Sequence, residues 1–376
     1  MKRFTILALT ATAVMAQVPA TAAPVAATPV ATAAEEAPLA PISMQLLQNH
    51  PGAPTGVEDV LLVPSANAGQ KAVAFQWSDP NNAEAYILWK NYFAAAQHTS
   101  GGGTDAQTIA SFGLMYPVWG AGLSLAYSDS SHEDPASNQT VTYHALSEAK
   151  LFGSFGWNGK DVYGSLLWMK PTDNVVTTPA SGSSNTNPRT DDVLLTVGIR
   201  KYPAAGVEGS AWSGQTTLGY EYFRPAGEQN PIMWIAQVYG QYGYVFITDG
   251  ITFLPGVDAY VDYRNGTADP DYYAAIGVSP YAALILPLYE HWTLKGGARY
   301  FVEQTLNDVQ QGKPSDFRDR GIISNTNGSV GLRYTRNRWA LEGSIANGFL
   351  SNGPYFISGT PTGGMIGSLA LTVNLK

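Results

Sequence analysis

The stretch WGAGLSLAYS, residues 119–128, places a large or apolar side chain at every second position. Trp119, Leu123, Leu125 and Tyr127 share one face, whereas glycine, serine and alanine occupy the other. A period of two residues puts successive side chains on opposite faces of a β-strand. The stretch therefore predicts a strand with one strongly apolar face and one small or polar face.

The same alternation recurs from about residue 84 to the C-terminus. It predicts about fourteen strands, each long enough to cross a hydrocarbon layer when tilted, and twelve or sixteen strands also fit. The predicted strands contain residues 85–93, 110–116, 119–127, 151–157, 162–168, 193–199, 212–222, 234–244, 257–263, 272–286, 292–302, 330–334, 339–345 and 369–375. Residues 73–77 alternate as well and predict one more strand, which either precedes the array, plugs its interior or lies in the periplasm.

The connections between these strands alternate between short and long. Short ones fall near residues 117, 158, 202–210, 247–250, 287–291 and 336, and longer polar ones at 96–106, 129–146, 171–190, 224–231, 264–271, 304–326 and 350–362. Short turns on one side and long loops on the other are expected of antiparallel up-and-down barrels in a membrane. We therefore predict an all-β fold, a transmembrane antiparallel up-and-down β-barrel. A secreted β-sandwich or propeller is the alternative, but strands this aromatic on one face would need a second covering layer.

Composition agrees with a barrel and excludes several classes of protein. Only 13% of the residues are charged, against about 25% in ordinary soluble domains. The chain has 21 tyrosines and 9 tryptophans, which suits aromatic belts at a membrane interface. The formal charge of −8 argues against a nucleic-acid partner. With no cysteine, disulfides and thiolate metal sites are excluded.

The N-terminal region predicts export. Residues 1–22 begin with Met1-Lys2-Arg3, continue with a short apolar run and end in small residues, as a secretory signal peptide does. Residues 23–80 begin with an Ala/Pro-rich linker and continue as a periplasmic or plug segment. Residues 84–376 form the predicted barrel domain, and the expected location is the bacterial outer membrane.

Over residues 84–376 the chain resembles the general class of Gram-negative outer-membrane β-barrels, including porins, in pattern rather than in a fingerprint motif. The resemblance implies outer-membrane lipid, small solutes and the barrel-assembly machinery as partners. In that class the last strand usually ends in an aromatic residue, whereas this chain ends in Leu375-Lys376. This departure leaves the handling by the usual assembly machinery open, and no segment marks an oligomeric state.

Charged side chains in the predicted strands fall almost entirely on the face that parity turns inward. These candidate lumen-lining and selectivity residues are Lys90, Lys150, Arg200, Glu221, Asp258, Asp262, Lys295, Arg299, Glu303, Arg333 and Glu342. Charge is tolerated in a water-filled lumen but costs about 2–4 kcal/mol at the lipid midplane. Two hypotheses follow: an acidic wall faces a basic wall across the pore, or the charges pair across neighbouring strands.

Tryptophans cluster near the predicted strand ends and predict an aromatic girdle. Its members are Trp119, Trp157, Trp168, Trp212, Trp234, Trp292 and Trp339. The alternative, stacking platforms for sugars, requires aromatic rings in the lumen, and the inward Tyr260 and Tyr281 are the better candidates for that role.

The function that these patterns favour is a porin-like channel for passive diffusion of small polar solutes. One alternative is a transporter of hydrophobic compounds, resembling fatty-acid or aromatic-hydrocarbon uptake barrels, and draws on the apolar inner positions near Tyr281. Another is a structural or adhesive barrel with a filled lumen. An enzyme is not expected, because only His132 in the acidic run 129–134 suggests a local catalytic cluster. There is no phosphate loop, dinucleotide fingerprint or EF-hand spacing, so we expect no cofactor and no metal.

Overall fold

The computed structural model describes residues 57–375 except 79–81, 101–105, 135–138, 170–174, 178–183, 187–191, 204–205, 223–231, 267–271, 308–321 and 346–365. The predicted signal peptide and linker, residues 1–56, lie outside the described residues. The wall of the fold consists of β1 (Lys71–Ser78), β2 (Asn82–Trp89), β3 (Tyr92–Ser100), β4 (Ala106–Met115), β5 (Trp119–Asp134), β6 (Gln139–Trp157), β7 (Lys160–Met169), β10 (Asp192–Lys201), β11 (Gly209–Tyr222), β12 (Ile232–Thr248), β13 (Ile251–Gly266), β14 (Tyr272–Tyr289), β15 (Trp292–Asn307), β16 (Ile322–Arg336), β17 (Trp339–Ile345) and β18 (Ile366–Asn374).

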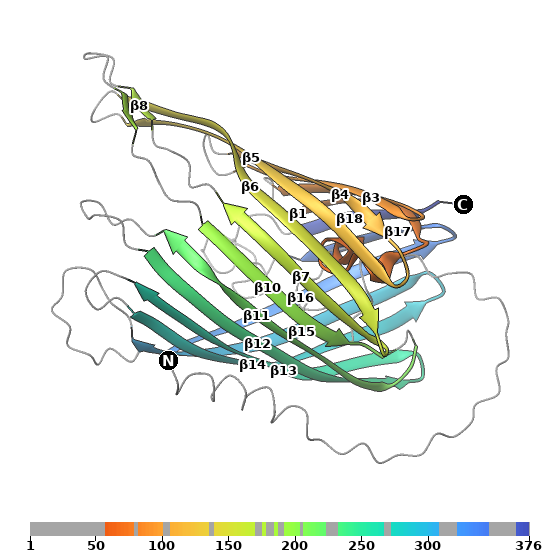
Figure 1. Cartoon of the computed structure of the whole chain (residues 1–376). Coiled ribbons are helices and arrows are strands. Elements are labelled where there is room, and N and C mark those ends of the chain that lie inside the picture. Colours follow the sequence, from red (N-terminus) through yellow and green to blue (C-terminus); the bar gives the residue numbers. More distant parts are fainter. Residues whose placement is uncertain are drawn as a thin grey trace, which may run out of the picture. The chain divides into compact units, whose positions relative to one another are not determined.

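Each wall strand pairs antiparallel with the wall strands before and after it in the chain. The sheet closes on itself because β1 also pairs with β18, with Val73 opposite Val373. Two further short strands, β8 (Val175–Thr177) and β9 (Ser184–Thr186), form a hairpin that continues from β6 beyond the wall. The described residues therefore form a closed up-and-down barrel of sixteen tilted strands (Figure 1).

The prediction of fourteen strands is wrong, because the N-terminal part of the wall holds two strands more. Residues 85–93 were predicted as one strand, but a turn at Lys90 and Asn91 divides them between β2 and β3. The turn has no glycine and apolar residues flank it, so the alternation conceals it; Lys90 nevertheless takes a positive φ of 58°. The turn also inverts the parity of Phe93, which was predicted to face outward and is buried inside. Residues 71–78 supply the other strand, so the barrel begins at Lys71 rather than at residue 84.

The short connections lie where the sequence predicts them. Asn158-Gly159 and Asp249-Gly250 make two-residue hairpin turns in which both residues have positive φ, the geometry that matches the twist of the flanking strands. At the opposite end of the barrel the strands run longer than predicted. β5 continues to Asp134 and β6 starts at Gln139, inside the segment 129–146 that was expected to be a loop.

The two faces of the wall differ as the alternation requires. On β10 and β11, Val197 and Leu218 are about half exposed on the outer face, whereas Thr217 is buried on the inner face. The same outward exposure of large apolar side chains recurs on strands all around the barrel. An outer belt of this kind suits contact with lipid, while polar groups on the other face line a lumen.

Residues 57–67, here called the internal segment, lie inside the barrel. They form two 3-10 helices, η1 (Val57–Leu61) and η2 (Pro64–Asn67). Val60 packs in a cluster with inward-facing side chains of β1 to β4 and β6, among them Tyr86, Phe93 and Phe152. An apolar patch on the inner wall therefore explains why the segment is held there, since burying apolar area is the main source of such attraction.

Candidate functional site in the barrel lumen

The inner face of β12 to β17 forms a charged wall, the first candidate functional surface. Its described charged residues are Asp258, Asp262, Arg264, Lys295, Arg299, Glu303, Arg333 and Glu342. They lie on the inward parity of their strands, where the side chains of Asp258, Lys295 and Glu342 are almost completely buried. With four carboxylates and four cations, this wall carries no net formal charge.

The charges of this wall form ion pairs along it. Arg299 on β15 donates from Nη2 to Asp258 Oδ2 on β13, across the intervening strand β14. Tyr239 Oη donates to the same Asp258 oxygen at 3.4 Å. Burial of Asp258 is thereby offset by two donors, because a buried carboxylate is tolerated only when it is paired and hydrogen-bonded.

A second pair lies further along the wall. Lys295 Nζ on β15 donates to Glu342 Oε2 on β17 at 2.7 Å, and the side chain of Glu342 is 0% exposed. Arg333 is the cross-strand neighbour of Glu342 on β16. Glu342 therefore has two cations near it, Arg333 on the adjacent strand β16 and Lys295 on β15, one strand further along the wall.

The third group lies on β12 and β13. Arg264 Nη2 donates to Asp262 Oδ2 at 3.0 Å, and Gln237 Nε2 donates to the same oxygen at 3.0 Å. The side chain of Arg264 is 35% exposed, in contrast to Asp262 at 10%. This part of the wall therefore offers a guanidinium to the lumen while its carboxylate is covered.

Three inward tyrosines each lie over a glycine on the neighbouring strand. Tyr260 on β13 is opposite Gly277 on β14, Tyr281 on β14 is opposite Gly256 on β13, and Tyr163 on β7 is opposite Gly198 on β10. At each glycine a Cβ atom would overlap the tyrosine ring or its hydroxyl. Each ring therefore occupies the space that a side chain would fill.

The hydroxyl of each of these tyrosines reaches the strand beyond the glycine. Tyr260 Oη donates to Glu303 Oε2 on β15, and Tyr163 Oη donates to Gln215 Oε1 on β11 at 3.3 Å. Tyr281 Oη accepts from Gln241 Nε2 on β12 at 3.2 Å. A ring that spans three strands in this way lies along the wall instead of projecting away from it.

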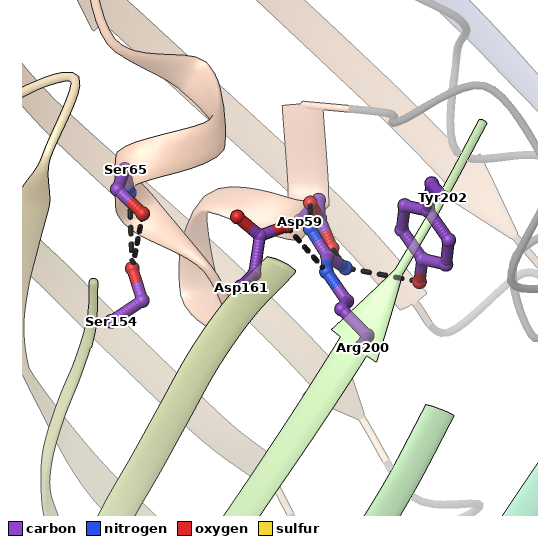
Figure 2. Close-up of polar contacts among 6 residues, drawn as sticks. All are labelled: Asp59, Ser65, Ser154, Asp161, Arg200 and Tyr202. Atoms are coloured by element: carbon purple, nitrogen blue, oxygen red, sulfur yellow. Dashed lines mark hydrogen bonds and ion pairs between the residues drawn. The ribbon is translucent and has the colours of Figure 1, made fainter. Parts of the chain in front are cut away.

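The internal segment is held by a charged cluster on β7 and β10, which β11 separates from β12, the first strand of the charged wall. Arg200 on β10 donates from Nη1 and Nη2 to the two carboxylate oxygens of Asp59, and from Nε to Asp161 Oδ2 at 3.1 Å (Figure 2). Its Nη1 also donates to Tyr202 Oη at 3.2 Å. Burial raises the pKa of the Asp59 carboxyl, and the Arg200 guanidinium opposes that shift. The fork of Arg200 thus connects the internal segment to the barrel in a bidentate geometry that lysine cannot reproduce.

A second contact fixes the other helical turn of the internal segment. Ser65 N donates to Ser154 Oγ on β6 at 3.1 Å, and the two hydroxyls lie 2.8 Å apart (Figure 2). Gly120 on β5 has no side chain where Pro64 and Ser65 lie against the wall, and a Cβ there would come within 2.6 Å of Pro64 Cβ. The close approach of the segment therefore depends on glycine at position 120.

The structure places nine of the eleven predicted lumen residues on the inner face. The other two are Lys90 and Glu221. Lys150, Arg200, Asp258, Asp262, Lys295, Arg299, Glu303, Arg333 and Glu342 have the inward parity. Lys90 is wrong as a lumen residue, since it lies exposed at the turn between β2 and β3. Glu221 is within β11, but its side chain lies outside the described residues.

The hypothesis of an acidic wall facing a basic wall is wrong for Asp258 and Arg299, and Lys295 and Glu342 pair with each other as the alternative hypothesis of paired charges predicts. These partners belong to the same wall and pair across one intervening strand. The physical reason is that strands two apart in a sheet are separated by only about 9–10 Å, so long inward side chains on them meet before they face across a lumen.

Other members of the site were missed from the sequence. Asp59 was not singled out because it lies outside any alternating segment, and Asp161 and Arg264 lie beside strand ends. Tyr163 and Tyr239 carry the inward parity, which was the available signal. Their hydrogen bonds to groups on other strands become visible only with the register of the sheet.

The predicted girdle tryptophans lie on the outer face near strand ends. Trp119, Trp157, Trp212, Trp292 and Trp339 lie toward the short-turn end, and Trp168 and Trp234 lie toward the other. Trp89, at the end of β2, joins the first group and Trp77, near the end of β1, joins the second. Two rings of outward tryptophans separated by an apolar band are the arrangement expected at the two interfaces of a bilayer.

Within the described part of the chain, no group of three or more histidines, aspartates or glutamates is arranged to hold a metal ion. No helix in these residues is long and apolar enough to cross a membrane. The side chain of His132, in the predicted acidic run, lies outside the described residues.

A closed antiparallel barrel with an apolar outer belt, tryptophans at both ends of that belt and a charged inner face defines the class of protein. It is an outer-membrane β-barrel protein, located in the bacterial outer membrane.

Comparisons with known proteins give no specific family. No protein-family model matches the sequence, and no curated protein matches it. Among solved structures, CdiB from Acinetobacter baumannii is 15% identical with a TM-score of 0.42, over 81% of this chain and 59% of that one. BamA from Haemophilus ducreyi lacking POTRA domains 1-3 is 11% identical with a TM-score of 0.39, over 81% and 69%. OmpT, an outer membrane protein of Vibrio cholerae, is 8% identical with a TM-score of 0.35, over 81% and 94%. The chain thus spans 59% of the length of CdiB.

Proposed function

We propose that this protein is a porin-like channel through which small polar solutes diffuse passively. The observation that carries the proposal is the inner face of β12 to β17, where charged and hydroxyl groups line the lumen over six neighbouring strands. Arg299 and Arg264 are partly exposed there, at 25% and 35%, so water reaches the wall. A hydrophilic inner surface lowers the cost of moving a polar solute through a membrane, because the solute exchanges hydrogen bonds with water and wall rather than losing them.

The placement of the internal segment is compatible with conduction. Its described contacts are with the inner side of β1 to β6 and with Arg200 on β10. The charged wall lies on other strands, and its tyrosines lie over glycines. We therefore expect the segment to narrow the lumen from one side and to leave a passage along the charged wall.

Single-channel conductance of the purified protein in a planar bilayer tests this proposal. Steady, ohmic steps in the nanosiemens-to-subnanosiemens range are the expected result. A matched pair of variants sharpens the test: Arg299→Trp, which adds bulk inside the lumen, is expected to lower the step size, whereas Val197→Trp, on the outer face, is not. A protein that inserts and stays silent would contradict the channel.

Two other functions give different outcomes in the same experiments. A structural or adhesive barrel would be silent in the bilayer, with the internal segment as part of its filling. A transporter of hydrophobic compounds would take up a hydrophobic tracer with little ionic conductance. An apolar inner cluster of Val245, Leu254 and Ala283 with Ile285 exists, but it is small beside the charged wall. We therefore keep the polar channel as the proposal.

A further inference from the structure

Tyr260 and Phe301 form an aromatic floor on the charged wall. The Tyr260 ring lies over Gly277, so one of its faces rests on the backbone of β14. Its hydroxyl is fixed by Glu303 on the strand beyond. Phe301 on β15 follows with the same inward parity, and the two ring planes differ by only 8° with centroids 6.1 Å apart. Because the backbone covers one face of Tyr260, the opposite face, against which Phe301 is stacked at an offset, is the one directed to the lumen.

Planar hydrogen-bonding groups surround this floor. Arg299 and Glu303 flank Phe301 on the same face of β15, and Asp258 and Asp262 flank Tyr260 on β13. Arg299 is paired with Asp258 and still 25% exposed, so it retains capacity to donate toward the lumen. The floor is thus apolar at its centre and offers both donors and acceptors at its edge.

This combination selects one chemical class of ligand. A simple ion gains little, because four carboxylates and four cations on the wall leave no net charge to attract it. A hydrocarbon would leave the charged edge without hydrogen bonds, which is costly. A pyranose ring has an apolar C–H face that can lie on an aromatic face, and equatorial hydroxyls that reach outward to charged groups at the edge.

We propose that the Tyr260–Phe301 floor is a binding subsite for a neutral saccharide ring, an inference that rests on the proposed channel function and names its substrate class. Tyr260 and Phe301 would stack against the sugar, and Arg299 and Glu303 would hydrogen-bond to its hydroxyls. Tyr163 has the same ring-over-glycine geometry on β7 and β10. It has no such aromatic neighbour among the ring pairs of the described residues, so it lies outside the subsite.

The first test is isothermal titration calorimetry of the full-length protein in detergent with maltotriose. The second is the block of the ion current by maltotriose in a planar bilayer. We expect saturable binding and a concentration-dependent block. Sorbitol, which has hydroxyls but no ring, is expected to show neither. Tyr260→Ala and Phe301→Ala are each expected to weaken binding by about tenfold, the change that corresponds to the loss of one aromatic contact. Tyr163→Ala, at a tyrosine outside the subsite, is expected to bind as the parent does.

The outcomes separate this inference from the channel proposal. Conductance without maltotriose binding would overturn the subsite and leave the channel standing. Maltotriose binding to a barrel that does not conduct would support the subsite and overturn the channel. Equal loss of binding in Tyr260→Ala and Tyr163→Ala would overturn the assignment of the subsite to the Tyr260–Phe301 floor. Circular dichroism of each variant, with an unchanged β-sheet spectrum, excludes misfolding as the cause.

Discussion

Arg200 on the barrel wall donates hydrogen bonds from both terminal nitrogens of its guanidinium to Asp59 of the internal segment, which is 141 residues away in the chain. The side chain of Arg200 is 2% exposed, and that of Asp59 is 12% exposed. A buried contact between residues so far apart in the sequence connects the internal segment to the barrel wall. Substitutions at these two residues therefore test what holds the segment in place.

Asp59→Asn is expected to loosen the internal segment. It removes the charge that Arg200 grips while Asp161 still neutralises the guanidinium, so we expect a loss of about 1–3 kcal/mol in the docking of the segment. Faster proteolysis within residues 57–70 and a noisier or larger channel current would report it. Ser65→Ala, which removes only a neutral hydrogen bond, serves as the milder control at about 1 kcal/mol. Identical proteolysis of Asp59→Asn and the parent would show that the contact does not hold the segment.

Glu342→Gln is expected to destabilise the barrel more than Lys295→Met. Glu342 is fully buried beside Lys295 and faces Arg333 in register, so neutralising it leaves two cations without that carboxylate. Removing one partner of a buried ion pair costs about 3–5 kcal/mol, whereas replacing both partners by apolar residues is often close to neutral. The midpoint of urea unfolding in detergent measures the change. The double variant Lys295→Met with Glu342→Leu should recover part of the loss, and a loss equal to the sum of the two singles would contradict the coupling.

Ion preference is expected to respond to single charges of the wall in opposite directions. The wall carries equal numbers of carboxylates and cations, so the parent channel should discriminate weakly between cations and anions. Arg299→Ser should shift the reversal potential in a salt gradient toward cation preference, and Asp262→Ser toward anion preference. Glu290→Ser, at a turn outside the lumen, is the control. Unchanged preference in both lumen variants would mean that these groups do not tune selectivity.

The outer belt is expected to tolerate charge according to depth. Val197 is 51% exposed and lies midway between the two levels of tryptophan on β11 and β12. Val197→Arg should therefore cost about 2–4 kcal/mol of unfolding free energy in lipid, whereas Trp157→Arg near the interface should cost about 0–1 kcal/mol. Equilibrium unfolding from lipid vesicles measures both. Equal costs at the two positions would contradict the proposed placement of the bilayer.

Much of the wall could be predicted from the sequence because the alternation of apolar and polar side chains within each strand indicates which face contacts lipid. The alternation in residues 119–128 and the Asn158-Gly159 turn are local signals, and both are where the structure has them. The turn at Lys90 and Asn91 was missed because it lacks glycine and because the apolar alternation continues on both sides of it. The error of two strands follows from that turn and from β1, whose partner β18 lies at the other end of the chain.

The sequence by itself determined the period of two, the alternation of short and long connections and the inward parity of most charges. These features depend on neighbouring residues and on the two solvents that the wall separates. Only the tertiary structure decided that Asp59 meets Arg200, that Asp258 pairs with Arg299 along one wall, and that Tyr260 lies over Gly277. Those contacts depend on strand register and on closure of the sheet, which bring together residues that no local pattern relates.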